Sequence, residues 1–387
     1  MPVPPARRAA IRRRLLAWYD AGHRALPWRF PQHGADPYRV WLAEVMLQQT
    51  QVAAAIPYYR RFVARWPSLA SLAEAEDAEV LAAWSGLGYY ARCRNLLSAA
   101  REALRRHGGL PAAPEALRAL PGFGPYTAGA VASIAFAAPV PAVDGNAARV
   151  LARLFLVKGD PASPPVRRRI GALAAALVPD RRPGDFNQAL MELGATVCRS
   201  PAPGCLRCPL RASCAARRAG RERQVPPPRR RPGRARLFLA CAALERGGDL
   251  LLVRRPARGL FGGLWAPPAG EAASEAEARA ALRRSLRELA GESARVGAEL
   301  ARVERTLTHR QLTLVAHRCR LGGKPRGEVR WVGRAELSRA GLPTAMRRLL
   351  EALPPGPGPV RAPTGGIQGG GPGGGSEKPL TSRVPSI

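Results

Sequence analysis

The chain has 387 residues, of which 46% are hydrophobic, so it is long enough for two or three domains with filled cores. Its 61 Lys and Arg outnumber its 28 Asp and Glu, and the net charge of +33 favours a polyanionic partner. It has no apolar run of 18 residues and no apolar segment directly after its basic N-terminus, which argues against a membrane span and a secretory leader. We therefore expect a cytoplasmic, nucleoid-associated monomer that does not bind membranes.

The positive charge is only a modest sign of nucleic-acid binding, because nearly all of it is Arg. The chain has three lysines, Lys158, Lys324 and Lys378. Abundant Arg, together with abundant Ala, Gly and Pro, is also typical of a GC-rich genome. The motifs must therefore carry the functional argument.

Residues 1–216 are predicted to form a mainly α-helical domain, since apolar residues recur at helical spacing between Pro and Gly breaks. The second helix has a clear start, because Asp36 can cap it and Pro37 suits its first turn. The predicted helices are 5–21, 37–55, 57–65, 76–84, 90–106, 125–136, 145–156, 165–177 and 185–195.

A single acid, Glu44, lies in an apolar helical stretch within the sequence AEVMLQQTQV, residues 43–52. Its helical neighbours include Val40, Trp41 and Leu47. Desolvation among such neighbours raises the pKa of a carboxyl group, so Glu44 is expected to hold a proton near neutral pH.

The sequence LPGFGPYTA, residues 120–128, is typical of a helix-hairpin-helix motif, here about 117–136. Gly122 and Gly124 permit a tight turn whose N–H groups can approach a DNA phosphate, and the next helix adds its positive N-terminal end. An ordinary turn between helices is the alternative. Asp144 follows at the start of another helix, where it is either a helix cap or an active-site acid.

Four cysteines, Cys198, Cys205, Cys208 and Cys214, have the spacing C-x6-C-x2-C-x5-C within residues 198–214. Four thiolates so close together suit either one tetrahedral zinc ion or a 4Fe-4S cluster. Zinc ribbons use two CxxC pairs and this loop has one, so the spacing favours the iron–sulfur cluster over zinc and over four free thiols. The alternative to a functional role is a group that only stabilises a surface loop.

The pattern changes after a charged, Pro-rich segment, residues 217–235, which is typical of a linker. Residues 236–353 contain strand-like runs, LFLACAAL, DLLLVRR, LTLVAHRCRL and EVRWV, and one predicted helix, 278–290. We predict a smaller α+β domain there. The Gly- and Pro-rich tail, 354–387, is expected to be disordered.

The hairpin, the downstream acid and the cysteine loop, in this order, resemble the endonuclease III superfamily of DNA glycosylases. Within it, AEVMLQQTQV, LPWR (26–29), GLGYYARCRNL (86–96) and VDGNAARVLAR (143–153) resemble the MutY-type adenine DNA glycosylases, and the similarity covers most of 10–216. The second domain resembles that family's C-terminal Nudix-like domain. The resemblance implies base excision repair of double-stranded DNA in which adenine lies opposite 8-oxoguanine or guanine.

The resemblance also implies a mechanism with two carboxyl groups, as in glycoside hydrolysis. Glu44 matches the acid that protonates the base, and Asp144 matches the carboxylate that stabilises the cationic sugar. Tyr126 and Asn146 match residues beside them. Because Tyr126 replaces the hairpin Lys of the endonuclease III branch, we expect a monofunctional glycosylase without a Schiff-base lyase step.

A base inside a stacked duplex must be flipped out before it can react. The resemblance implies that Gln49 and Tyr89 enter the duplex, with Thr50 and Leu87 close to the lesion strand. Trp28 and Arg29 are expected to line the base pocket. For Tyr89 and Trp28, packing in the core is the structural alternative.

A Nudix domain raises pyrophosphate hydrolysis as a rival activity. The acids that follow Gly270 are out of register with the magnesium-binding box of that family, so recognition is the better interpretation. The family's lesion-sensing F-S-H reads Leu307-Thr308-His309 here, so Thr308 and His309 keep hydrogen-bonding groups and Leu307 loses the ring. A purely structural turn is the alternative.

Two rivals to an adenine glycosylase remain open at this level. One is a bifunctional glycosylase and lyase for oxidised pyrimidines, against which Tyr126 and the second domain argue. The other is a non-catalytic protein that binds damaged DNA, against which the presence of both Glu44 and Asp144 argues.

Overall fold

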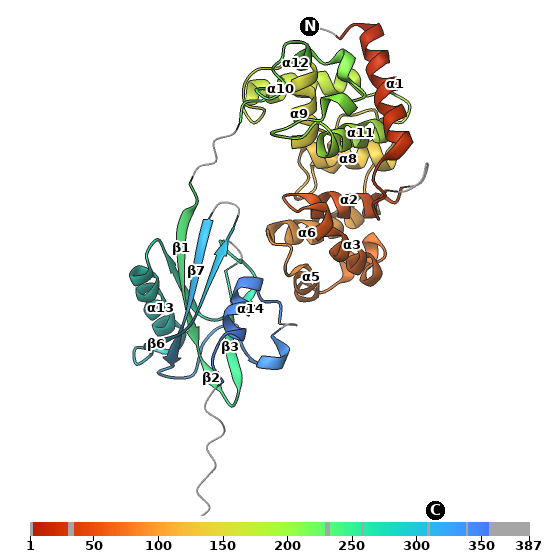
Figure 1. The fold of residues 1–387 in the computed structure, drawn as a ribbon. Helices are drawn as coiled ribbons and strands as arrows, with labels where there is room; N and C mark the ends of the chain where they lie inside the picture. Colours follow the sequence, from red (N-terminus) through yellow and green to blue (C-terminus); the bar gives the residue numbers. More distant parts are fainter. Residues whose placement is uncertain are drawn as a thin grey trace, which may run out of the picture. The chain divides into compact units, whose positions relative to one another are not determined.

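The computed structural model describes residues 3–29, 35–228, 233–256, 259–307, 310–337 and 340–355. These residues form a helical part, up to residue 228, and a part of mixed strands and helices from residue 233 (Figure 1). In the described ranges, no helix is both long and apolar enough to cross a membrane. The predicted disordered tail lies outside the described residues from 356 onward.

The first apolar core of the helical part is rich in aromatic residues. Phe62 is fully buried, with its ring centroid 4.9 Å from that of Trp66 and 5.6 Å from that of Trp84. Tilted and edge-on ring pairs of this kind add to the energy of burial. The helices of this region are α2 (Pro37–Leu47), α3 (Val52–Arg65), α4 (Leu69–Glu74), α5 (Asp77–Trp84), α6 (Ala91–His107), α7 (Pro114–Arg118) and α8 (Pro125–Phe136).

The second core is mostly aliphatic, with Ile11, Leu15 and Leu151 fully buried in it. Its elements are α1 (Pro5–Gly22), α9 (Gly145–Leu154), α10 (Pro164–Leu177), α11 (Pro183–Thr196), α12 (Ala215–Arg218) and the 3₁₀ turns η1 (Cys205–Arg207) and η2 (Arg211–Ser213). Helix α8 packs against both α2 and α11, so it joins the two cores.

The prediction of one helix over 37–55 is wrong. Helix α2 starts as expected, with the Asp36 carboxylate accepting from the Tyr38 N–H at 2.9 Å, but it ends at Leu47. Gln49 then has a φ of 59°, in the left-handed region that a right-handed helix excludes. A new helix, α3, begins at Val52 and holds Pro57 inside it, so the predicted break near residue 56 is also wrong.

The helical part continues beyond residue 216, where the linker was predicted to begin. Residues 215–218 form α12, and Val225 is 3% exposed in the second core. The guanidinium of Arg153 donates to the Val225 carbonyl at 2.8 Å. The Pro-rich composition conceals this packing, because one buried Val and one hydrogen bond leave no periodic pattern.

The C-terminal part is built on a mixed sheet in the order β5-β1-β7-β6. Strand β1 pairs in parallel with β7, and the outer pairs are antiparallel. The strands are β1 (Ala235–Ala243), β5 (Ala269–Ala272), β6 (Arg295–Thr306) and β7 (Arg310–Arg320).

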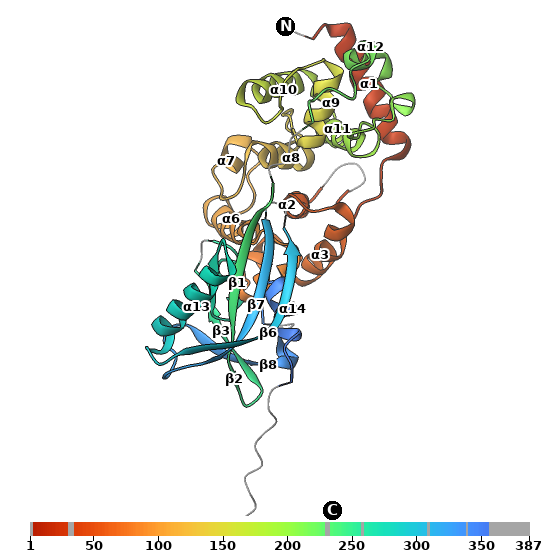
Figure 2. The ribbon, with the colours of Figure 1, turned by 60° about the vertical axis from the view of Figure 1, so that its left-hand side comes forward.

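The two faces of this sheet carry different helices, because side chains alternate along a strand. From β1, Leu239 and Cys241 face the core that includes Met346 of α14 (Thr344–Glu351). Ala240 and Ala242 face the core beneath α13 (Glu275–Ala290). Figure 2 shows α13 and α14 on opposite sides of the strands. The predicted class, a mainly α domain followed by an α+β domain, is confirmed.

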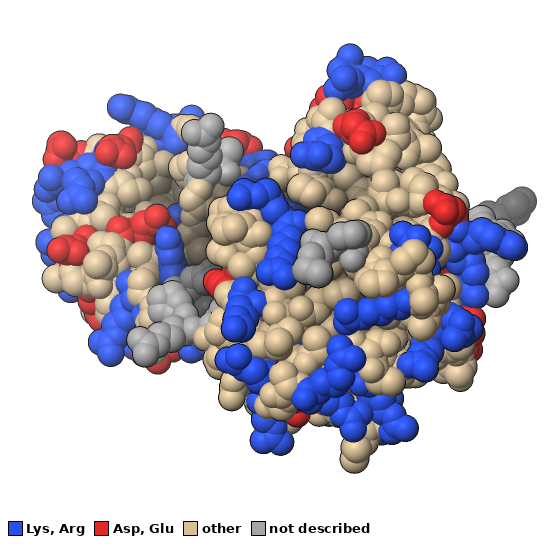
Figure 3. Space-filling model, turned by 90° about the horizontal axis from the view of Figure 1, so that it is seen from above, with Lys and Arg blue, Asp and Glu red and all other residues tan. Residues whose placement is uncertain are grey.

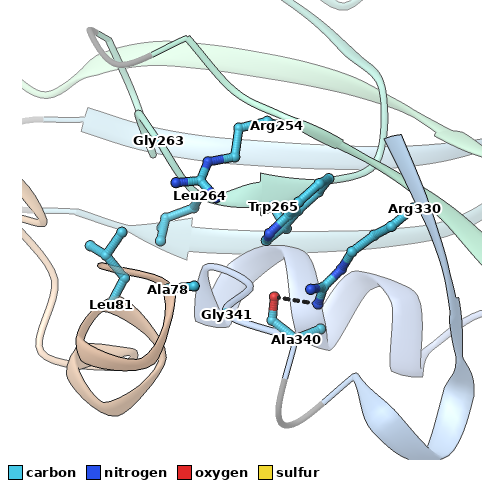
Figure 4. A pocket seen from close by; sticks show the side chains of 9 residues that line it. All are labelled: Ala78, Leu81, Arg254, Gly263, Leu264, Trp265, Arg330, Ala340 and Gly341. Atoms are coloured by element: carbon cyan, nitrogen blue, oxygen red, sulfur yellow. Dashed lines mark hydrogen bonds between the residues drawn. The ribbon is translucent and has the colours of Figure 1, made fainter. Parts of the chain in front are cut away.

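A second, smaller sheet is centred on β3 (Asp249–Arg254), which pairs with β2 (Glu245–Arg246), β4 (Trp265–Ala266) and β8 (Val329–Gly333). Trp265 lies between two guanidinium groups, that of Arg330 at 4.7 Å and that of Arg254 at 5.7 Å from its ring centroid (Figure 4). Arg330 also donates to the Ala340 carbonyl at 3.0 Å. These cation–π contacts fix the short strand β4 against its neighbours.

Candidate active site

Glu44 lies near the end of α2 and is 7% exposed. The hydroxyl of Tyr126, from the first turn of α8, donates a hydrogen bond to its Oε2. Burial raises the pKa of Glu44 to about 7, and the nearby Asp144 carboxylate acts in the same direction, against the effects of Tyr126 and Arg29. The carboxyl group can therefore hold a proton near neutral pH and can also lose it there.

Tyr126 itself remains a neutral phenol, since burial and the two carboxyl groups raise its pKa well above the usual value. Its hydroxyl also lies 3.3 Å from the Met191 sulfur. The hairpin position that a lyase would fill with an amine thus holds an uncharged donor directed at Glu44.

Asp144 caps α9 through its Oδ1, which accepts from the Ala147 N–H at 2.7 Å. Its Oδ2 accepts from the Asn146 side chain at 2.8 Å. The helix-cap interpretation is confirmed, and the capped carboxylate also lines the same cavity as Glu44.

A cavity of about 570 Å³ contains both carboxyl groups. This volume lies in the range of small-molecule binding sites. The residues that line it come from the segment before α2, from α2 and the loop after it, from the starts of α3, α8 and α9, and from α11: Arg24, Leu26, Trp28, Arg29, Glu44, Leu47, Gln48, Gln49, Thr50, Val52, Tyr126, Asp144, Gly145, Asn146, Gln188, Met191, Glu192 and Ala195.

Trp28 and Arg29, the two residues expected in the base pocket, both line this cavity. Trp28 is also a core residue, 7% exposed and packed edge-on against Tyr59 at 5.3 Å, so its two interpretations are compatible. The Arg29 guanidinium also forms an ion pair with Glu192, whose Oε2 lies 2.7 Å from the Arg29 Nη2.

The sequence reasoning missed Glu192, a third buried acid of the cavity. It is 2% exposed and accepts from Arg24 at 2.6 and 2.7 Å and from Arg29 at 2.7 Å. Burial acts to raise its pKa, but the hydrogen bonds from the two arginines outweigh burial and lower the pKa to about 2. Glu192 is therefore an ionised acceptor, whereas Glu44 is a proton donor. The signal was present, because Glu192 is also a single acid in an apolar helical stretch, ALMELGAT.

A second omission is Arg149, one turn into α9. It donates to the Asn146 side-chain oxygen at 2.8 Å, to the Gly194 carbonyl at 2.8 Å and to the Cys198 carbonyl at 2.8 Å. It thereby connects the residue that holds Asp144 to the first cysteine of the loop.

The structure brings two loops together beside the cavity: the 48–51 loop after α2 and the 86–90 loop before α6. Gln49 and Tyr89 both have positive φ, 59° and 50°, and Tyr89 is 38% exposed. Leu87 is buried and Thr50 half-buried. The packing alternative therefore applies to the neighbouring Tyr90, which is 8% exposed, and not to Tyr89.

The hairpin between α7 and α8 needs Gly122, which has a φ of 76°. A Cβ there would approach the Asn95 Cβ to 2.8 Å. Gly124 begins α8 with open space around it, which leaves its backbone accessible to a phosphate.

The four cysteines line one small cavity together with Arg153, Arg211, Arg217 and Glu222. Arg153 is 3% exposed and donates to the Cys198 carbonyl at 3.1 Å and to its sulfur at 3.3 Å. Among the described residues, no group of three or more His, Cys, Asp or Glu is placed to hold a metal ion as the side chains stand. Four thiols beside the buried guanidinium of Arg153 nevertheless fit a negatively charged centre bound by thiolates.

Basic side chains cover the end of the helical part that carries α1 and α10, and few acids interrupt them (Figure 3). Exposed members include Arg13 and Arg14 of α1 and Arg167, Arg168 and Arg169 of α10. Such a surface attracts a polyanion over a distance of about one Debye length.

Two acids of the C-terminal part, Glu271 and Glu275, form ion pairs with arginines. Glu275 pairs with Arg302 at 2.8 Å, and this hydrogen bond lowers the pKa of Glu275. Glu271 pairs with Arg255 at 2.9 Å. The predicted lesion-sensing residues, Thr308 and His309, lie outside the described residues, which resume at Arg310.

Comparison with known proteins identifies the class of both parts of the chain. Residues 42–175 match the HhH-GPD superfamily of base excision DNA repair proteins, and residues 240–352 match the NUDIX domain. The structure of a thermostable thymine-DNA glycosylase is similar to this one, with a TM-score of 0.50 and 27% identity, over 55% of this chain and 98% of that chain. The fold and the site are those of a helix-hairpin-helix DNA glycosylase of base excision repair.

Adenine DNA glycosylases match over more of the chain. The Homo sapiens enzyme is 39% identical over 88% of this chain and 73% of its own, and the Mus musculus enzyme is 38% identical over 88% and 77%. That of Mycobacterium tuberculosis (strain ATCC 25618 / H37Rv) is 44% identical over 56% of this chain and 70% of its own. The chain belongs to the adenine DNA glycosylase family.

Proposed function

We propose that this protein removes adenine that lies opposite 8-oxoguanine, or guanine, in duplex DNA, by hydrolysis of the N-glycosidic bond without strand cleavage. The observation that carries the proposal is the pair of carboxyl groups in one cavity, Glu44 with a pKa of about 7 and Asp144 bound as a helix cap. Two carboxyl groups with different protonation states are what acid-assisted glycoside cleavage requires.

In this mechanism Glu44 protonates a ring nitrogen of adenine and turns the base into a neutral leaving group. The C–N bond then breaks, its electron pair goes to the base, and the sugar becomes an oxocarbenium ion. Asp144 stabilises that cation, and water adds to the sugar and gives its proton to the ionised Glu44. Tyr126 positions Glu44 through its hydroxyl, and Asn146 positions Asp144.

Glu192 has a different role in this proposal, because it is ionised and paired with Arg24 and Arg29. A carboxylate and guanidinium groups present both acceptors and donors along one wall of the cavity. Adenine offers an amino donor and ring-nitrogen acceptors, so this wall suits its edge.

The DNA contacts are assigned to two places in the helical part and one in the C-terminal part. The hairpin with Gly122 and Gly124 binds a phosphate through backbone N–H groups. Gln49 and Tyr89 enter the duplex when the adenine is flipped out, and Thr50 and Leu87 support them. The C-terminal part recognises 8-oxoguanine through Thr308 and His309.

The resident cofactor in this proposal is a 4Fe-4S cluster held by Cys198, Cys205, Cys208 and Cys214. When bound, the cluster cross-links the loop between α11 and α12. Arg153 is the matching counter-charge, since it is buried and donates to the Cys198 sulfur. A brown protein with about four iron atoms and acid-labile sulfide per chain supports this assignment. A colourless protein with one zinc per chain contradicts it and supports the zinc alternative.

The substrate is tested with duplexes that differ only in the base opposite a labelled adenine: 8-oxoguanine, guanine or thymine. The proposal expects fast single-turnover release opposite 8-oxoguanine, slower release opposite guanine and none opposite thymine. Equal rates with all three partners would contradict recognition of the opposite base.

The monofunctional assignment is tested on the same products. The strand should break only after alkali, and borohydride should trap no protein–DNA adduct, because Tyr126 supplies no amine. Alkali-independent cleavage with a trapped adduct would instead support a lyase.

A further inference from the structure

Arg92, in the first turn of α6, is a half-buried cation that the proposed mechanism does not use. Burial lowers its pKa to about 10, which leaves it charged at neutral pH. Among the described residues no carboxylate pairs with it. Its hydrogen bonds go to backbone carbonyl oxygens and to one hydroxyl, and all of them come from two places in the chain.

One guanidinium nitrogen, Nη1, binds the end of α2 and the loop that follows. It donates to the carbonyls of Val45 at 2.9 Å and Met46 at 3.0 Å, and to that of Gln48. The C-terminal end of a helix leaves such carbonyls without partners inside the helix. A cation at this end also interacts favourably with the negative end of the helix dipole.

The other nitrogen, Nη2, joins the two loops. It donates to the Thr50 hydroxyl at 3.2 Å on one side, and to the carbonyls of Leu87 at 3.3 Å and Gly88 at 3.2 Å on the other. The guanidinium also lies over the rings of Trp84, at 5.4 Å, and Tyr89, at 5.5 Å.

The two loops need such support, because each holds a non-glycine residue in the left-handed region, Gln49 at 59° and Tyr89 at 50°. A non-glycine residue in that region is strained and persists only where its surroundings fix it.

We propose that Arg92 is a positioning residue that joins the 48–51 and 86–90 loops into one rigid wedge, so that opening of the duplex depends on it. Arg92 donates to the end of α2 and to the two loops, and to neither Glu44 nor Asp144, so its effect on cleavage of the glycosidic bond is expected to be small beside its effect on duplex opening. This inference rests on the proposed function, in which Gln49 and Tyr89 enter the DNA.

The test compares two substrates: a duplex with adenine paired opposite 8-oxoguanine, and the same strand with that adenine in a single-base bulge, which needs little opening. Arg92→Met should lower the single-turnover rate on the paired duplex by roughly tenfold or more, as small misplacements do. On the bulge its rate should stay within about threefold of the wild type. Arg92→Lys keeps the charge but loses the forked guanidinium, so its rate on the paired duplex should lie between those of the wild type and Arg92→Met.

Arg101→Met is the matched control, because Arg101 lies on the same helix and also donates to carbonyls, those of Ala73 and Ala75, both at 2.9 Å. It should react like the wild type on both substrates. Glu44→Gln should fail on both. An equal loss on both substrates by Arg92→Met, or no loss on either, would overturn the proposal.

Amide hydrogen exchange in the DNA-free protein separates this inference from the proposed function. Arg92→Lys should exchange faster in the 48–51 and 86–90 loops and should be unchanged in α9 and α11. Unchanged exchange in both loops overturns the inference even if adenine is released. If the wild type releases no adenine, the proposed function fails, and faster loop exchange still supports the link between the loops.

Discussion

At the scale of single residues, Glu44 shows how opposing effects set the pKa of one carboxyl group. Burial and Asp144 raise its pKa, while Tyr126 and Arg29 lower it, and the balance lies at about 7. Because Glu44 acts as an acid, we predict that the single-turnover rate of adenine release falls as the pH rises above 7, by roughly tenfold per pH unit. DNA affinity measured at each pH is the control. A rate that is flat between about pH 6 and pH 9 would contradict the role of Glu44.

The same shift makes a prediction for stability. A carboxyl group with a raised folded pKa stabilises the fold below its unfolded pKa, and this contribution is lost as the pH rises through about 7. Glu44→Gln removes the titrating group. We expect it to raise the free energy of unfolding at pH 8 by up to about 3 kcal/mol relative to the wild type, and to change it little near pH 4.5. Denaturant unfolding at the two pH values measures this; the same difference at both would exclude burial of a charge as the cause.

The sequence could predict Glu44 and not the role of Glu192, for a physical reason. The environment of Glu44 is mostly its own helix, and helical neighbours can be read from spacing. The partners of Glu192, Arg24 and Arg29, lie 168 and 163 residues away, and only the folded chain brings them together. The raised pKa of Glu44 was therefore predicted from the sequence, whereas the lowered pKa of Glu192 required the structure.

At the scale of elements, the site depends on the close approach of α9 and α11. A Cβ on Gly194 would come within 2.6 Å of the Asn146 Cβ and 2.7 Å of its carbonyl oxygen. We predict that Gly194→Ala separates the two helices, costs roughly 1–3 kcal/mol of unfolding free energy, and slows adenine release because Asn146 holds Asp144.

The matched control for that change is Gly171→Ala in α10, where nothing lies within 4 Å of the added Cβ. It should leave the rate unchanged and stabilise the protein slightly, as Ala does in a helix. Thermal unfolding and single-turnover kinetics measure both variants. If Gly194→Ala behaves like Gly171→Ala, the packing account of Asn146 is wrong.

Element boundaries show where sequence patterns fail. The predicted helix 37–55 continues its apolar pattern through Val52 and Ala55, yet the chain turns at Gln49. At this turn the Gln48 carbonyl and the Thr50 hydroxyl accept hydrogen bonds from Arg92, which lies more than 40 residues away. A local pattern cannot contain such a distant partner, so helix existence was predicted well and this boundary was not.

At the scale of the whole molecule, the order of motifs was enough to predict the class of both parts. The hairpin, the downstream acid and the cysteine loop specify a helical glycosylase, and the change to alternating strands specifies the second part. The end of the helical part at residue 216 was misplaced, because Val225 packs without a periodic signal.

The net charge of +33 spreads over surfaces beyond the cavity (Figure 3). We predict that affinity for undamaged duplex DNA falls by at least about tenfold between roughly 50 and 200 mM salt, because binding releases counterions. The rate of release from bound substrate should change little, since Glu44 and Asp144 lie in a cavity. A titration of labelled DNA at several salt concentrations measures this, and a flat affinity would contradict an electrostatic contribution.

The most direct test of the account measures free adenine released in a single turnover from a duplex with adenine opposite 8-oxoguanine. The wild type should release one adenine per bound duplex and leave an alkali-labile site. Glu44→Gln and Asp144→Asn should bind the same duplex with near-wild-type affinity and release adenine at least roughly a hundredfold more slowly. Release by Glu44→Gln at the wild-type rate would contradict the assignment of Glu44 as the acid, and with it the mechanism proposed for this cavity.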